Sequence, residues 1–259
     1  LDYFIETRSN IFMQRRTTPG LLGSAEDPWA NYGKVRNKGY EATLNFNHHF
    51  GKDFFLNLRA SYSYARNKIL EIDEPAAKKG TYRAQTGHSM NEFYGLVAER
   101  LYEASDFDEN GKLLDGIPKP ELGNDVNPGD IKYADLNNDG IVNSEDCKYL
   151  GHTSDPRGIY GFGASMSYKN LDFSFFFQGN YDTWNMLHGD LMISGIDTHN
   201  FYSNASDRWT EQNPSQNVFY PRAYENVHLN NTTASTWWLK RQDMCRLKTV
   251  ELGYSLPKA

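Results

Sequence analysis

Residues 40–64 read YEATLNFNHHFGKDFFLNLRASYSY, and this stretch decides the fold class. Apolar and polar side chains alternate on both sides of a short polar turn, Gly51-Lys52-Asp53. A period of two residues is typical of strands whose two faces meet different environments. The stretch therefore predicts a hairpin with one apolar face and one polar face. Its apolar positions are Tyr40, Ala42, Leu44 and Phe46 in the first strand and Leu56, Leu58, Ala60, Tyr62 and Tyr64 in the second.

The same alternation occurs elsewhere in the chain. It predicts a second hairpin over residues 160–178, with its turn at Lys169-Asn170, and single strands near residues 1–12 and 249–256. Between the six strands the connections run long, short, long, short, long, and the longest covers residues 66–157. Short turns at one end and long loops at the other are typical of a transmembrane β-barrel. The expected fold is therefore all-β: about six antiparallel strands of a large barrel, with long extracellular loops.

Composition excludes several classes of protein. The net charge of −6 argues against a nucleic-acid partner, and no apolar run reaches the roughly 18 residues of a transmembrane helix. Two cysteines, Cys147 and Cys245, are expected to be free, buried thiols, with a disulfide between them as the alternative. No nucleophile–base motif, phosphate loop or suitably spaced carboxylate pair is present, so no enzymatic activity is expected. The chain begins at Leu1 inside a predicted strand, which indicates a piece of a longer protein.

Residues 135–146 read DLNNDGIVNSED and have the spacing of a calcium-binding loop. Gly140 stands where such loops turn sharply. The alternative is a turn whose side chains accept hydrogen bonds from backbone amides. In either case the expected role is structural, as a clamp on the loop over residues 66–157. The candidate calcium ligands are Asp135, Asn137, Asp139, the main-chain carbonyl of Ile141, Asn143 directly or through water, and Asp146.

Other features of the long connections lead to further expectations. Residues 92–97 resemble a short strand, and residues 144–150 a short helix that ends at Gly151. All five tryptophans lie in or beside the long connections. Trp184 and Trp209 are candidates for stacking on sugar rings, with loop packing or an interfacial aromatic belt as the alternative.

Four segments together suggest a family. They are residues 37–41 (NKGYE), 129–140 (GDIKYADLNNDG), the hairpin over 160–179, and 247–257 (LKTVELGYSLP). In this order they resemble the C-terminal part of the barrel domain of SusC/RagA-type TonB-linked outer-membrane proteins of Bacteroidetes. The resemblance covers most of the chain.

The resemblance implies a bacterial outer-membrane barrel on the order of 22 strands, with a plugged lumen. It also implies a SusD-like surface lipoprotein as partner, contact with outer-membrane lipid, and import of glycans or peptides. The plug domain, and the contact with TonB that belongs to the missing N-terminal part, would lie outside this chain. Two alternatives remain: a secreted, calcium-stabilised β-sandwich that binds carbohydrate, and a glycoside hydrolase of β architecture. The sequence does not name the transported substrate.

Overall fold

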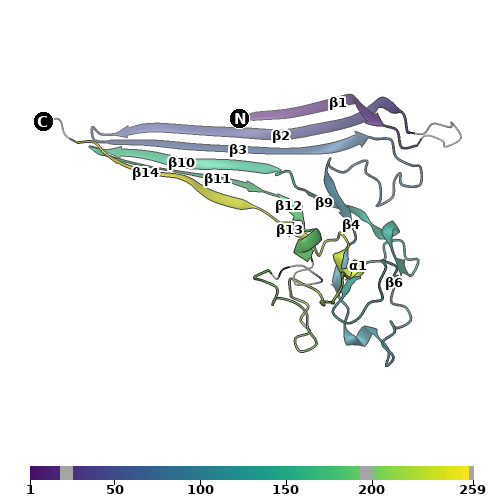
Figure 1. Ribbon diagram of the computed structural model, residues 1–259. Helices are drawn as coiled ribbons and strands as arrows, with labels where there is room; N and C mark the ends of the chain where they lie inside the picture. The colour runs from purple at the N-terminus through teal and green to yellow at the C-terminus, as the bar shows by residue number, and fades with distance from the viewer. Residues whose placement is uncertain (18–25, 193–199, 201, 257–259) are drawn as a thin grey trace.

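The structure is a computed structural model that describes residues 1–17, 26–192, 200 and 202–256. It consists of a sheet of long strands and a body of loops at one end of that sheet (Figure 1). The sheet has six strands, and each pairs antiparallel with the next, as the alternating sequence pattern predicted. The strands are β1 (Asp2–Gln14), β2 (Trp29–Phe50), β3 (Phe54–Glu71), β10 (Gly158–Tyr168), β11 (Leu171–Tyr181) and β14 (Met244–Tyr254).

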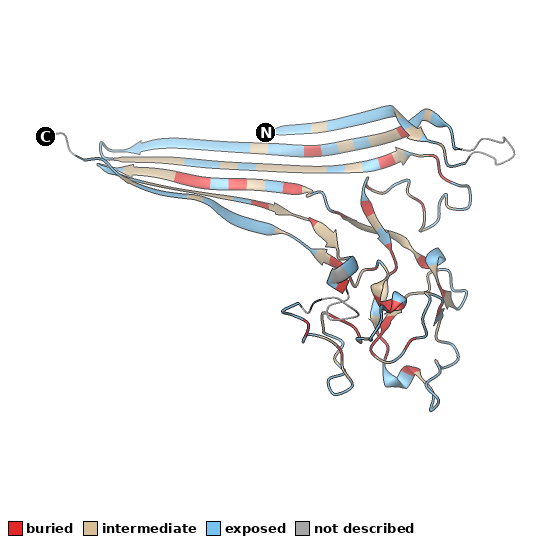
Figure 2. Ribbon diagram, in the orientation of Figure 1, coloured by how far each residue is buried: buried red, intermediate tan, exposed pale blue. Residues whose placement is uncertain are grey.

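The strand register collects the apolar side chains on one face. Phe46 lies opposite Leu58, Leu58 opposite Ala164, Ala164 opposite Phe175, and Phe175 opposite Val250. Within the described residues no second sheet covers this face, and Phe46 and Val250 are 43% and 55% exposed (Figure 2). A β-sandwich would bury such a face against another sheet. The structure therefore argues against the sandwich alternative and for contact with lipid.

Tyrosines mark one border of the apolar face. The rings of Tyr40 and Tyr64 stack at 5.4 Å and those of Tyr62 and Tyr181 at 6.1 Å, and the hydroxyls of the second pair are hydrogen bonded. From Tyr62 to Phe54, at the opposite turn, strand β3 runs roughly 27 Å at ~3.4 Å per residue. Tilted strands of this length match an apolar band about 25 Å tall. Stacked tyrosines thus form an aromatic belt at this border of the apolar face.

Several boundaries differ from those expected. Strand β2 already begins at Trp29, and β3 continues to Glu71, so the longest connection starts at residue 72. The helix expected over residues 144–150 is wrong. A single 3₁₀ turn, η3 (Ser144–Asp146), leads into strand β9 (Lys148–Thr153). Strand β9 pairs with β4 (Glu92–Gly95), so tertiary pairing overrides the local helical pattern. The short strand expected over residues 92–97 is confirmed by β4.

The described residues of 72–157 and 182–243 form one unit, which we call the loop body. No helix among the described residues is long and apolar enough to cross a membrane. The remaining elements of the loop body are β5 (Ala98–Leu101), η2 (Ala104–Asp106), β6 (Lys119–Pro120), β7 (Ile131–Tyr133), β8 (Ile141–Val142), β12 (Trp184–Met186), η4 (Gly189–Met192), α1 (Leu229–Thr232) and β13 (Leu239–Arg241).

A buried carboxylate ties the end of β1 to the start of the loop body. Asp73 accepts hydrogen bonds from the Arg15 guanidinium at 2.8 Å, the Arg16 amide at 2.7 Å, and the Thr17 hydroxyl at 2.7 Å. The hydrogen bond from Arg15, with those from Thr17 and Arg16, holds the pKa of Asp73 well below its usual range. This charge-assisted cluster fixes the chain where it leaves the sheet.

The assignment of the apolar face to lipid leads to a first prediction. In the full-length protein in lipid vesicles, Phe175→Arg should lower the free energy of unfolding by about 2–4 kcal/mol, because it places a cation near the middle of the apolar band. Denaturant unfolding measures this effect. Ser174→Arg, one residue away on the opposite face, should change stability much less. Equal losses for both variants would contradict the assignment.

Candidate functional site: the joined loop body

The two long loops share one core. Residues of the first loop, including Leu101 and Ile131, pack with residues of the second loop, including Trp238. Leu101, Ile131 and Trp238 have no exposed surface. Buried residues gather in the loop body, and the sheet itself is mostly exposed or half-buried (Figure 2). The loops therefore fold as one unit with a hydrophobic interior.

Backbone hydrogen bonds also connect the two loops. The amide of Leu96 donates to the carbonyl of Ala234 at 3.0 Å, and the amide of Thr236 donates to the carbonyl of Leu96 at 3.0 Å. A Cβ atom on Gly95 would collide with the Ala234 carbonyl, so the close approach of the loops requires glycine at this position. The amide of Arg222 donates to the carbonyl of Gly129 at 2.8 Å.

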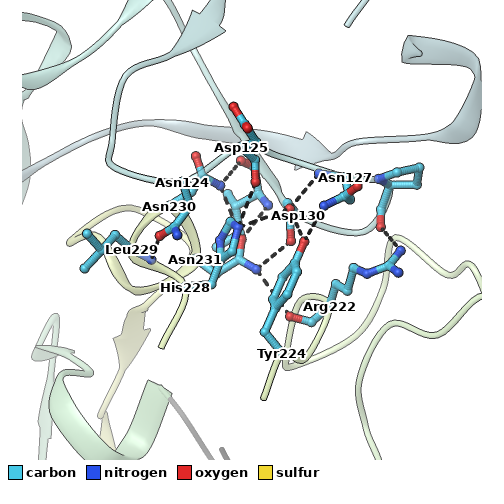
Figure 3. A network of polar contacts seen from close by, with 12 residues as sticks. Asn124, Asp125, Asn127, Asp130, Arg222, Tyr224, His228, Leu229, Asn230 and Asn231 are labelled. Carbon is cyan, nitrogen blue, oxygen red and sulfur yellow. Dashed lines mark hydrogen bonds and ion pairs between the residues drawn. The ribbon is translucent and has the colours of Figure 1, made fainter. Parts of the chain in front are cut away.

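A polar network centred on Asp130 lies inside this joint (Figure 3). Asp130 is fully buried, and its carboxylate accepts hydrogen bonds from the Asn231 side chain at 2.7 Å, the Tyr224 hydroxyl at 2.6 Å and the Asn127 amide at 2.8 Å. The imidazole Nε2 of His228 lies 3.8 Å from the same carboxylate. Asn231, Tyr224 and His228 come from the second loop and reach Asp130 only because the two loops are folded together. Asn127 reaches it because the chain turns tightly between the two residues.

Burial sets the electrostatics of the network. It raises the pKa of Asp130, against the opposing effect of hydrogen bonds from Tyr224 and Asn127, and it raises the pKa of the Tyr224 phenol. An acid, a tyrosine and a histidine in contact resemble a catalytic group. However, Asp130 does not reach solvent, and the cavity beside His228 has a volume of about 20 Å³. That volume holds roughly one water molecule, so the arrangement suits a structural clamp.

Two adjacent asparagines complete the clamp. The Asn231 side chain accepts a hydrogen bond from the Ile131 amide at 3.0 Å, and the Asn230 side chain donates to the Ile131 carbonyl at 2.9 Å. The Tyr133 hydroxyl donates to the Asn230 carbonyl at 2.6 Å. The Trp238 indole N–H donates to the Asn231 carbonyl at 2.8 Å. Helix α1 thus presents its polar groups to strand β7. Among the described buried side-chain atoms of this region, His228 Nδ1, Asn230 Oδ1 and Ser235 Oγ have no hydrogen-bond partner.

The two candidate tryptophans lie in different environments. Trp209 is 6% exposed, with its ring against Gly129 and under the Arg222 guanidinium at 5.5 Å. It is a core residue, so a sugar-stacking role does not fit its position and loop packing does. Trp184 is half-buried. Its ring stacks on His152 at 4.0 Å, and its indole N–H donates to Asp182 at 3.0 Å.

The predicted calcium loop is a compact turn. Asp135 accepts hydrogen bonds from the Asn138 and Gly140 amides at 2.7 and 2.8 Å. Gly140 has φ +83°, a conformation that favours glycine. Asn137 accepts from the Asp139 amide at 3.0 Å.

The other candidate ligands also face backbone amides. Asp139 accepts from the Ile141 amide at 2.8 Å, and Asn143 from the Glu145 amide at 2.7 Å. Asp146 is fully buried and accepts from the Leu136 amide at 2.8 Å and the Asn143 amide at 2.9 Å. Among the described residues no three acidic, histidine or cysteine side chains converge as a metal site. Calcium binding therefore stays a prediction, and the turn is stable through its own hydrogen bonds.

The turn over residues 135–146 is hydrogen bonded to neighbouring segments of the loop body. The Lys119 amide donates to the Gly140 carbonyl at 2.9 Å, and the Glu121 amide donates to the Val142 carbonyl at 2.8 Å. Arg83 contacts the Glu145 carboxylate at 3.0 Å. These contacts join the turn to two earlier parts of the same long loop.

The two cysteines are free, as expected. Cys147 is half-buried in the loop body, where burial raises the pKa of its thiol. Cys245 lies in strand β14, opposite Gly179, and it is exposed, so the expectation that both thiols are buried is wrong for this residue. The two positions belong to different parts of the molecule.

Sequence reasoning missed the residues that hold the loops together: Asp130, Asn231 and Trp238. The family-like segment over residues 129–140 contained a signal, because Gly129 packs on Trp209 and Asp130 anchors the network. The oxygen-bearing side chains from Asp135 onward are the more conspicuous pattern in this segment. The partners lie about a hundred residues away, and no local pattern pairs them.

The fold and the loop body define a class: the sheet is part of the wall of a transmembrane β-barrel that carries long folded loops at one end. No model of a known protein family matches the chain. The TonB-dependent receptor P26 of Formosa agariphila is 29% identical over 99% of the chain and 26% of that protein. The TonB-dependent receptor SusC of Bacteroides thetaiotaomicron is 26% identical over 74% of the chain and 20% of that protein.

Solved structures agree on the fold. The RagAB peptide transporter superposes with a TM-score of 0.64 at 18% identity, over 98% of this chain and 26% of that one. The RagAB importer in its open-open state gives a TM-score of 0.67. The chain spans about a quarter of the length of these relatives. The resemblance inferred from four segments of the sequence is confirmed. Over most of its length the chain is similar to TonB-dependent receptors of the SusC/RagA type, which are proteins of the bacterial outer membrane.

The Asp130 network can be tested by removing one of its side chains. Asn231→Ala leaves the Ile131 amide without its acceptor and Asp130 without one of its donors. Each buried polar group that lacks a hydrogen-bond partner lowers the free energy of unfolding by about 1–3 kcal/mol. We expect limited proteolysis of the full-length receptor to cut the loop body faster, while the barrel stays intact. Thr233→Ala, in the same segment, removes only a hydrogen bond to the Leu229 carbonyl and should leave cleavage unchanged. Unchanged cleavage of Asn231→Ala would contradict the clamp.

The calcium prediction has a separate test. Calcium at about 100 times its dissociation constant should stabilise the folded loop body by about 2.7 kcal/mol. We expect Asp139→Ala to abolish this rise in thermal stability. Glu145→Gln also removes one charge from the loop but no predicted ligand, so it should keep the response. A calcium response that Asp139→Ala leaves intact would rule the site out.

Proposed function

We propose that the full-length protein is a TonB-dependent transporter that imports glycan or peptide fragments across the outer membrane. This chain supplies part of the barrel wall and two of its loops. The support is its similarity to receptors named TonB-dependent, among them SusC, over 74–100% of the chain. One observation carries the proposal. Two long loops are built into a single folded body at the end of an unbroken, outward-apolar sheet.

The loop body would serve as a docking surface for a SusD-like surface lipoprotein. A surface that is already ordered loses less conformational entropy when a partner binds than a flexible loop does. The shared core and the Asp130 network provide this order in the present chain. The ordered surface of the loop body thus supports docking of the lipoprotein at this end of the barrel.

The substrate would reach the loop body from outside. A hollow of about 470 Å³ is lined by residues 110–117, 119–120 and 125–127, a size within the range of ligand pockets. Trp184 is the remaining aromatic candidate for contact with substrate. Because the RagAB neighbour is described as a peptide importer and another relative is SusC, both peptides and glycans are retained as substrate classes.

Uptake by whole cells tests the proposal. A strain that lacks the full-length receptor should lose uptake of one of two labelled pools, oligosaccharides or oligopeptides, and the wild-type gene should restore it. Loss of TonB energy transfer should abolish the same uptake. Unaltered uptake of both pools in the deletion strain would overturn the proposal.

The same strains test the roles of the loop body. Trp184→Ala should lower uptake roughly 2- to 10-fold if its ring contacts substrate, at unchanged receptor abundance. Trp184→Phe, which keeps an aromatic face, is the matched variant. Affinity purification of the receptor from native membranes should recover a surface lipoprotein, and Asn231→Ala should reduce its recovery. A receptor that purifies without any lipoprotein would contradict this part of the proposal.

A further inference from the structure

Four cations gather on two neighbouring strands of the sheet. Arg36 and Lys38 lie on β2, and Arg66 and Lys68 lie on β3. The register puts Lys38 opposite Arg66 and Arg36 opposite Lys68. Like charges directly opposite each other in a sheet are destabilising. A bound source of negative charge would relieve the repulsion in two such pairs in succession.

This cluster lies on the membrane-facing side of the sheet. It follows directly after the pair Tyr40–Tyr64 of the tyrosine belt, with the same two-residue step. The register of β2 and β3 has no irregularity between Arg36 and Phe50. The four cations therefore share a face with the apolar row of Phe46 and Leu58 and do not face the lumen.

The height of the cluster matches the lipid headgroups. Along the strand, Lys38 lies roughly 7 Å and Arg36 roughly 14 Å beyond Tyr40, at ~3.4 Å per residue. Strand tilt shortens both heights. The polar zone of a bilayer leaflet is about 5–8 Å thick, and long cationic side chains bend toward the layer of charge that suits them. The long loops leave the same end of the sheet, so this is the outer leaflet (Figure 1).

Carboxylates in the part of the chain that the structure describes do not pair with the cluster. All four side chains are exposed, and none takes part in an ion pair with another described residue. Glu71, the acidic residue at the end of β3, lies 3.4 Å from Lys34 instead. Glu41 belongs to the opposite face, where Ser63 donates to it at 3.0 Å.

The cations line a hollow that already exists. Its volume is about 270 Å³, and Asn67, Gly87 and Ser89 complete its wall. The amide of Gly87 donates to the Ile69 carbonyl at 2.9 Å, and the Ile69 amide donates to the His88 carbonyl at 2.8 Å. These bonds fix the loop segment against β3 and hold the hollow open beside the cations.

We propose that this hollow binds the phosphate group of an anionic lipid of the outer leaflet. Arginine pairs with phosphate through two parallel hydrogen bonds, and lysine adds a point charge. The tyrosine belt and the apolar band directly below would contact the sugar or glycerol unit and the acyl chains of the same molecule. A free phosphate ion would use only the cations. The lipid would fix the height and tilt of the barrel in the membrane, whatever the receptor transports.

Native mass spectrometry of the full-length receptor in detergent tests this assignment. The probes are a diphosphorylated lipid A, its dephosphorylated form, and inorganic phosphate. The wild-type receptor should retain the phosphorylated glycolipid at least tenfold more strongly than the dephosphorylated one. This comparison of the two lipids uses only the wild-type receptor, so its outcome does not depend on whether a variant folds.

A charge-matched pair of variants locates the site. Arg66→Gln with Lys68→Gln should reduce retention of the phosphorylated glycolipid roughly 10- to 30-fold. Lys78→Gln with Lys79→Gln removes the same charge from a nearby loop and should leave retention unchanged. Arg66→Lys with Lys68→Arg keeps the charge and should retain most of the binding.

Three results would overturn the proposal. The first is equal retention of phosphorylated and dephosphorylated lipid by the wild-type receptor. The second is equal loss in the two neutralised pairs. The third is complete displacement of the glycolipid by millimolar inorganic phosphate, which would indicate a site for the free ion. Loss of substrate uptake plays no part in these readouts, so failure here leaves the proposed transport function untouched.

Discussion

The in-register pairing of six long strands is the constraint on which the rest of the molecule depends. Because side chains alternate along a strand, a slip of one residue would turn every apolar group to the other face. The row from Phe46 through Leu58, Ala164 and Phe175 to Val250 exists only in the observed register. The same register puts the tyrosine belt in one band and the four cations in the next. The height of each chemical layer is therefore a consequence of strand pairing.

The loop body solves a different physical problem. Long connections that leave a sheet carry many backbone polar groups, and those that become buried need partners. Here the partners come from the other long loop. Asp130 and Asn231 hold the joint, and Trp238 fills the space beside them. A buried carboxylate is costly alone, but three donors surround this one. The result is an ordered surface made of segments that are far apart in the chain.

Much of the sheet was predictable from local patterns. Alternation identified all six strands and both short turns, and the order of long and short connections indicated a barrel. Strand ends were less predictable. Residues 29–38 are polar enough to look like a loop, yet they continue β2 because β1 and β3 supply hydrogen-bonding partners on both sides. The helix expected after Ser144 failed for a similar reason, since β4 offers β9 a ladder that local propensity does not encode.

The sequence by itself determined the fold class, the two faces of the sheet and the resemblance to a family, because these depend on residue order over short spans. It also marked residues 135–146 as an oxygen-rich segment with the spacing of a calcium-binding loop, a prediction that stays untested. Only the tertiary structure decided which side chains meet. Trp209 became a core residue instead of a ligand contact, and Asp130 met Asn231 across about a hundred residues. The tertiary structure also placed Lys38 beside Arg66. Such contacts depend on chain closure over long separations, which local periodicity does not record.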